Sequence, residues 1–163
     1  MNTITHTLLI GAGATAFIDA WALMRRRLLG TKLPDYALVG RWIGAMSRGR
    51  WRHESIAAVP PVRGELAIGW TAHYAIGVVF AAGLVLVVGA SWFAEPAIVP
   101  AVLAGIVSVA APFFVMQPAM GAGVAASRTP RPAAARLQSL VTHTLFGVGL
   151  FLAAVVVDRL RGV

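Results

Sequence analysis

The sequence predicts an all-α, polytopic membrane protein with four transmembrane helices in a bundle, and two observations carry this prediction. Charged residues make up 12% of the chain and hydrophobic residues 58%, whereas soluble domains average about 25% charged residues. Four apolar runs of about 20 residues alternate with polar connections, and this is the length that one membrane-crossing helix needs. We expect a single domain over residues 1–163.

The first helix is expected at residues 4–24, directly before Arg25-Arg26-Arg27. A secretory signal has its basic residues before the apolar run, so we expect a retained span whose N-terminus lies outside. The glycine-rich run Leu8–Ala16 also resembles the start of a dinucleotide-binding fold. The alternating strands and helices of that fold are missing. Close packing of small residues between helices is therefore the favoured interpretation.

Residues 25–68 form the longest connection, a basic loop that we expect in the cytoplasm. Apolar side chains recur at helical spacing between Tyr36 and Met46, directly after Pro34-Asp35. Asp35 can cap such a helix. This pattern predicts a short amphipathic helix that lies flat in the headgroup layer.

The other three spans are expected at residues 69–90, 98–117 and 138–157. Pro112 lies inside the third run, where we expect it to free the carbonyl of Ser108 and kink the helix. His73 and His143 each precede a glycine by four positions, near the start of the second and fourth runs. This parallel predicts two repeated helical hairpins.

The distribution of basic residues predicts one orientation in the membrane. Nine of the fourteen Lys and Arg lie in residues 25–64 and three in residues 126–136. The positive-inside rule places both connections in the cytoplasm and both termini in the periplasm. Trp21 and Trp70 then lie at the inner interface and Trp92 at the outer one.

Three runs resemble an uncharacterised family of bacterial integral inner-membrane proteins, domain of unknown function 2938. They are GAGATAFIDAW (11–21), DYALVGRW (35–42) and MQPAMGAGVAASRTPRP (116–132). The likeness covers nearly the whole chain, but the family carries no functional residues to transfer. The resemblance implies a multi-pass protein of the bacterial inner (cytoplasmic) membrane.

Four polar side chains interrupt the apolar runs near the inner face: Asp19, His73, Gln117 and His143. Because alternate helices run in opposite directions, we expect all four at a similar, shallow depth. A charge at the centre of a membrane helix costs about 2.5–3.5 kcal/mol, so such groups usually face the interior and pair. The four residues predict either a polar intramembrane site or contacts that fasten the bundle.

Three functions follow from these interpretations, and the sequence leaves them open. The best guess is a small transporter or channel-like protein with the Asp/His cluster as its polar site. The first alternative is a non-transporting membrane scaffold or subunit. The second is a redox protein that holds haem between His73 and His143.

Enzyme chemistry is not favoured, and no cofactor other than the haem alternative is predicted. The chain has no cysteine, which excludes disulfides and thiolate sites. It also lacks a Ser-His-Asp arrangement, paired carboxylates and a P-loop. Asp19 with the two histidines would supply three zinc ligands, but the sequence does not constrain their spacing.

The expected partners are the lipid bilayer and anionic phospholipid headgroups, whereas nucleic acid is not expected. A basic residue near an anionic surface contributes about 1 kcal/mol. The candidate anion or headgroup contacts are Arg63, Ser127, Arg128, Thr129 and Arg136. A homo-oligomer stays open.

Overall fold

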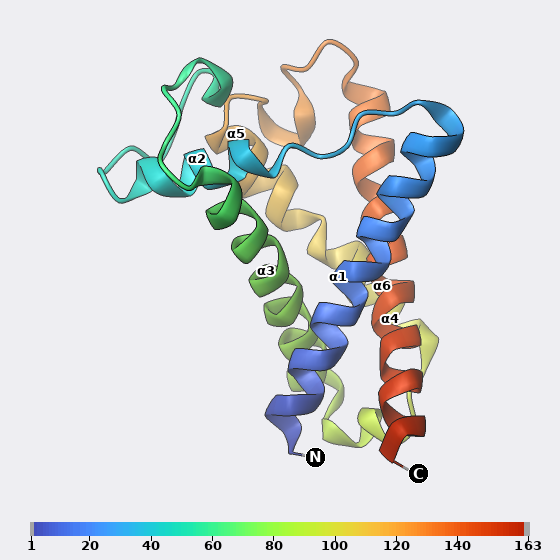
Figure 1. The fold of residues 1–163 in the computed structure, drawn as a ribbon. Helices are drawn as coiled ribbons and strands as arrows, with labels where there is room; N and C mark the ends of the chain where they lie inside the picture. The colour runs from blue at the N-terminus through green and yellow to red at the C-terminus, as the bar shows by residue number, and fades with distance from the viewer. Residues whose placement is uncertain (1, 162–163) are drawn as a thin grey trace. The chain divides into compact units, whose positions relative to one another are not determined.

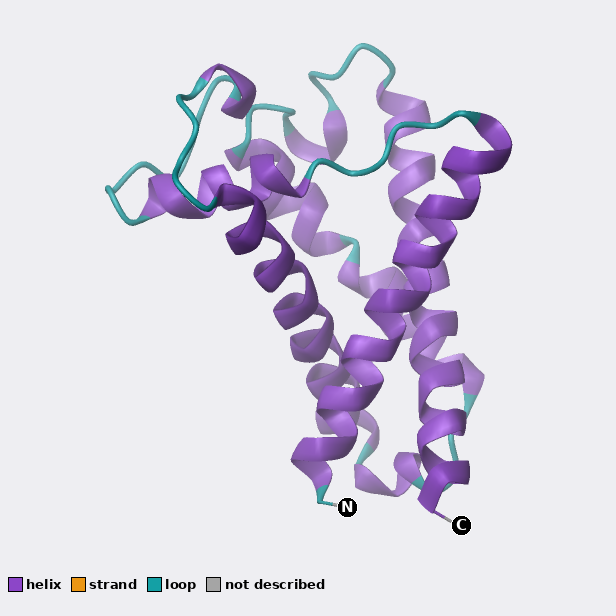
Figure 2. Cartoon of the chain, in the orientation of Figure 1, coloured by secondary structure: helices purple, strands orange, loops and turns teal. Residues whose placement is uncertain are grey.

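The computed structural model describes residues 2–161, and all regular structure in that range is helical. Figure 2 shows helices and loops in this part of the chain and no strand. The all-α prediction is therefore confirmed. The α-helices are α1 (Thr3–Leu29), α2 (Tyr36–Met46), α3 (Glu65–Val88), α4 (Ile98–Ser108), α5 (Gln117–Ala119) and α6 (Pro132–Arg161), labelled in Figure 1.

Four helical segments are long and apolar enough to cross a membrane: Thr3–Leu29, Glu65–Val88, Ile98–Ala119 and Pro132–Leu160. Only 17% to 33% of the residues in their most apolar stretches are buried. Large aliphatic side chains lie on the outside instead; Leu86 and Val87 are each 86% exposed. Soluble proteins rarely expose apolar patches of this extent. Length, composition and this outward apolar surface together make the segments candidate membrane spans.

The helices are longer than the apolar runs that predicted them. The helix predicted at residues 4–24 continues to Leu29, α3 begins at Glu65 rather than 69, and α6 begins at Pro132 rather than 138. Hydropathy marks the stretch that can lie in lipid, whereas arginine and leucine continue a helix beyond it. α1 ends only where Gly30 takes a left-handed conformation (φ 63°) and donates its N–H to Arg26.

The third span is interrupted, as Pro112 predicts. α4 ends at Ser108, a π-helix runs from Pro112 to Met116, and α5 follows. The N–H of Gln117 donates to the carbonyl of Pro112, five residues earlier. Proline has no N–H to donate to the carbonyl four residues before it, so the regular ladder breaks here.

The chain divides into two compact units, and each is described by itself. Unit 1 comprises Met1–Leu33, Tyr74–Ser108 and Val141–Val163, and unit 2 comprises Pro34–His73 and Val109–Leu140. The single domain that chain length predicts stays a prediction.

Unit 1 is built on close approaches between helix backbones at glycine. α3 approaches α1 where a Cβ added to Gly77 would overlap the hydroxyl of Thr15. α6 approaches α4 where a Cβ added to Gly147 would lie 2.6 Å from the carbonyl oxygen of Ala101. These contacts enclose an apolar core of Ile10, Ala14, Ala81, Leu84, Trp92, Phe93, Ala101, Phe146, Leu150, Ala154 and Val157.

Trp92 belongs to this core. It lies in the 3₁₀ turn Ala90–Phe93, is 5% exposed, and donates its indole N–H to the carbonyl of Ala97 at 3.1 Å. The position of Trp92 at the outer interface stays a prediction, because burial of the ring does not fix its depth in a membrane. The turn folds the indole over the apolar ends of the helices, where its one donor is satisfied locally.

Replacing Gly147 with alanine tests the close approach of α6 to α4. The new methyl group would press on α4 backbone atoms, so we expect Gly147→Ala to lower the stability of the protein by about 1–3 kcal/mol. Gly83→Ala in α3 is the matched control because no atom lies within 4 Å of its added Cβ. The control should be neutral or slightly stabilising. Equal thermal unfolding of the two variants in detergent would contradict the packing.

Candidate functional site

Asp19 lies in α1 and accepts a hydrogen bond from the hydroxyl of Tyr74 in α3, at 3.1 Å within unit 1. Both side chains are half-buried. The bond joins two candidate spans. Tyr74 was not among the predicted site residues, although it directly follows His73.

His143 lies in α6 and meets Ser108, the last residue of α4, with 2.7 Å between Nδ1 and the serine Oγ. Ser108 is 5% exposed, and its hydroxyl donates to the carbonyl of Gly105 at 2.6 Å. A serine hydroxyl has one proton. When the serine donates that proton to the carbonyl of Gly105, the Nδ1–H of His143 donates to the serine Oγ. The pair lies at the break in the third span.

The packing of α4 on α6 brings this pair together. A Cβ added to Gly105 would overlap the backbone oxygen of His143 and would lie 2.7 Å from the Cα of Gly147. The two backbones can approach this closely only because both positions are glycine. The short separation lets a serine hydroxyl on a one-carbon side chain reach the imidazole.

His73 belongs to unit 2 and pairs with the first residue of α2. Its Nε2 lies 2.9 Å from the Tyr36 hydroxyl, and the two rings stack with centroids 4.3 Å apart. The Trp70 ring packs against Tyr36 at 4.5 Å. Tyr36 is part of the short helix predicted from the 36–46 pattern, and Asp35 caps that helix as predicted, accepting from the N–H of Ala37.

Gln117 makes the weakest contact of the predicted set. Its Nε2 lies 3.5 Å from the Ser139 hydroxyl of α6, at the long limit for a hydrogen bond. Its Oε1 is buried and has no partner. A buried acceptor left in this state costs about 1–3 kcal/mol.

Each of the four predicted residues therefore has a partner within its own unit. Asp19 and His143 lie in unit 1, and His73 and Gln117 lie in unit 2. A site that joins all four stays a prediction. Within residues 2–161, no group of three His, Cys, Asp or Glu side chains is arranged to hold a metal ion.

His6 is a buried polar residue that the sequence reasoning missed. It is 3% exposed, its Nδ1 lies 2.8 Å from the carbonyl oxygen of Asn2, and its ring stacks on Phe93 at 4.9 Å. A carbonyl can only accept, so Nδ1 carries the proton. Nε2 is buried without a partner. The histidine ring packs against the apolar core of unit 1 through Phe93.

An ion pair fixes α2 to the start of α3 in unit 2. Arg41 donates from Nη2 and Nε to the two carboxylate oxygens of Glu65 at 2.8 and 2.9 Å, and from Nη1 to the carbonyl of Val59 at 3.0 Å. Glu65 also accepts from the N–H of Val62 at 2.9 Å. The hydrogen bond with Glu65 raises the pKa of Arg41 above its usual value. A two-pronged contact of this kind specifies geometry as well as charge.

The loop that holds most of the candidate anion contacts is closed by its own hydrogen bonds. The N–H groups of Ser127, Arg128 and Thr129 donate to the carbonyls of Val124, Ala122 and Ala126. These backbone groups are therefore engaged, and side chains would have to contact an anion. Arg63, the remaining candidate, is exposed.

Arg136 supports the same loop from α6. Its Nε donates to the carbonyl of Ala125 at 2.8 Å. Ala125 and Ala126 both take left-handed conformations, with φ of 47° and 59°, which costs an alanine about 1–2 kcal/mol. The arginine helps to hold this strained turn, which explains its position without any bound anion.

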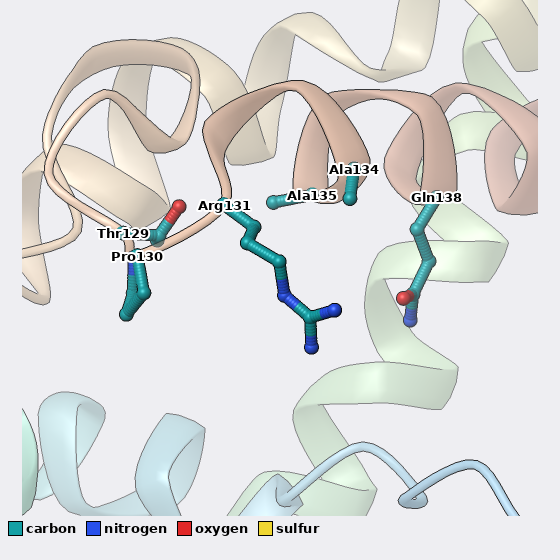
Figure 3. A pocket seen from close by; sticks show the side chains of 6 residues that line it. All are labelled: Thr129, Pro130, Arg131, Ala134, Ala135 and Gln138. Carbon is teal, nitrogen blue, oxygen red and sulfur yellow. The ribbon is translucent and has the colours of Figure 1, made fainter.

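An open hollow of about 400 Å³ lies beside the first turns of α6. Figure 3 shows the side chains of Arg131, directly before α6, and Gln138, in α6, extending to the same side. Of the candidate anion contacts, only Thr129 lines it. Arg131 was omitted from that set, although it belongs to the same basic loop. The residues that line the hollow are Thr129, Pro130, Arg131, Ala134, Ala135 and Gln138.

Neutralising Glu65 tests whether the ion pair positions α2. We expect Glu65→Gln to lower the thermal unfolding temperature, because Arg41 loses its charged partner while its side chain stays 12% exposed. Glu54→Gln is the control for the loss of one negative charge at an exposed position. A Glu65→Gln variant that unfolds at the same temperature as Glu54→Gln would show that the pair contributes nothing.

Comparison with known proteins places the chain in a family. No curated protein and no solved structure matches it. The family model described as "Protein of unknown function (DUF2938)" matches residues 8–157. Because the match covers most of the chain, the protein belongs to this family of unknown function.

Proposed function

We propose that the chain is a multi-pass inner-membrane protein whose four spans form a bundle, and that it acts as a non-transporting membrane subunit or scaffold. The observation that carries this proposal is the pairing of Asp19, His73 and His143 with a hydroxyl group on another helix. Side chains that hydrogen-bond to a neighbouring helix in this way hold the helices together. Both termini lie in the periplasm, and the basic connections lie in the cytoplasm.

The pairs join successive spans in a way that suits a repeated hairpin. Tyr74–Asp19 connects α3 with α1, and Ser108–His143 connects α4 with α6. Each hairpin also has a glycine in close approach, Gly77 in the first and Gly147 in the second. Lipid supplies no hydrophobic attraction between helices, so close packing and hydrogen bonds of about 0.6 kcal/mol each must hold them.

Passage of a proton or small solute is a second candidate, favoured by the break in the third span. π-helical segments and discontinuous membrane helices are frequent at functional sites. The Ser108–His143 pair lies at this break. An imidazole beside a hydroxyl has one nitrogen that can accept a proton and one that can donate it.

The haem alternative makes a separate demand on His73. Its Nε2 lies against the Tyr36 hydroxyl, so ligation of iron through Nε2 would require that contact to break. A visible absorption spectrum after haem-replete expression tests this alternative. A Soret band that disappears in His73→Ala would favour haem binding over both other functions.

Single cysteines test the orientation, because the wild-type chain has none. Cysteines at the exposed positions Ser47 and Ser127 should react with an impermeant thiol reagent only after the inner membrane is opened. A cysteine at Ser91 should react in intact cells. Labelling of Ser47→Cys in intact cells would overturn the orientation.

Proton flux separates the scaffold from the passage candidate. Purified protein in vesicles with an internal pH dye should show no flux above protein-free vesicles when a potassium diffusion potential is imposed. Flux that is present in the wild type and lost in Ser108→Ala would instead establish passage through the break. Melting curves of both proteins in detergent identify any loss that comes from unfolding alone.

A further inference from the structure

The loop that follows α2 carries three arginines around one exposed tryptophan. Arg48, Arg50 and Arg52 are all exposed, and Trp51 is 62% exposed. Among the described residues, the three guanidinium groups have no hydrogen-bond or ion-pair partner. The stretch 47–53 contains no acidic residue. These side chains therefore form a basic surface that no internal contact explains.

The backbone of this loop is fixed, so Trp51 is presented rather than loosely attached. The N–H of Arg50 donates to the carbonyl of Ala45 at 3.1 Å, across a turn in which Gly49 has a φ of 74°. The indole N–H of Trp42 donates to the carbonyl of Trp51 at 3.0 Å. Both contacts use backbone atoms of the loop and leave its long side chains outside.

Contacts on either side tie the loop to the ends of two candidate spans. α2 packs on the first turn of α3, where a Cβ added to Gly40 would overlap the carbonyl of Glu65. The N–H of His53 donates to the carbonyl of Ala119 at 2.8 Å, and Ala119 ends the third span. The loop thus lies at the level where one span begins and another ends.

We propose that Arg48, Arg50, Trp51 and Arg52 form a binding site for anionic phospholipid headgroups. The proposal rests on the membrane insertion proposed above. Guanidinium groups bind phosphate oxygens in pairs of hydrogen bonds, and tryptophan lies preferentially at the headgroup level. The loop lies at the ends of two candidate spans, where lipid headgroups would be. A site for nucleic acid would not need to lie there, so this position favours a lipid.

Lipid binding to the full-length protein in detergent micelles tests the site, with native mass spectrometry as the readout. Phosphatidylglycerol and phosphatidylcholine are titrated separately. Each arginine near an anionic surface raises the binding affinity about fivefold. We expect Arg48→Gln/Arg50→Gln/Arg52→Gln to weaken phosphatidylglycerol binding on the order of 100-fold and to leave phosphatidylcholine binding unchanged. The corresponding triple lysine variant, which keeps the charge, should recover most of the affinity.

The matched control is Arg25→Gln/Arg26→Gln/Arg27→Gln, which loses the same charge at the end of α1. Its phosphatidylglycerol affinity should fall far less than that of the loop variant. An equal fall would mean that binding follows net charge alone and would overturn the site. The headgroup site would also be overturned if the loop variant lost binding to a short RNA but bound phosphatidylglycerol as the wild type does.

Alkaline carbonate extraction of cell membranes distinguishes failure of this site from failure of the membrane proposal. Protein released into the supernatant would contradict membrane insertion itself. Protein that stays in the membrane, with the loop variant binding phosphatidylglycerol like the wild type, would contradict only the headgroup site.

Discussion

The close approach of helix backbones at glycine is the constraint on which the rest of the structure depends. Cβ atoms added to Gly11 and Gly105 would meet backbone atoms of a neighbouring helix. Such contacts suit an apolar surrounding, where van der Waals packing replaces the hydrophobic effect between helices. The short separations then allow the hydroxyls of Tyr74 and Ser108 to reach their partners. Polar pairing is thus a consequence of glycine placement.

The same constraint organises unit 2 around α2. Cβ atoms added to Gly40 and Gly69 would overlap the backbone of the facing helix. This contact brings Arg41 to Glu65 and Tyr36 to His73. The apolar pattern that predicted a helix lying on the membrane surface also serves this packing. The helix is confirmed, whereas its position in the headgroup layer stays a prediction.

Function depends on how the break in the third span is interpreted. Pro112 and the π-helix interrupt the backbone ladder, and the Ser108–His143 pair lies next to that interruption. A fastening contact and a proton-handling pair have the same static geometry. Asp19 and His73 also have hydroxyl partners, and this shared pairing favours the scaffold. The basic surface at Arg48–Arg52 adds a lipid-facing role that either function can use.

The sequence by itself determined the helical class, the four apolar runs and the interruption at Pro112. These features follow from properties local to the chain: hydropathy over about 20 residues, helical spacing, and the missing N–H of proline. It also singled out Asp19, His73, Gln117 and His143, because polar groups in apolar runs are conspicuous. Only the tertiary structure decided their partners and the burial of Trp92. Those depend on which faces of two helices turn toward each other, and that rotation is set by glycine contacts between residues far apart in the sequence.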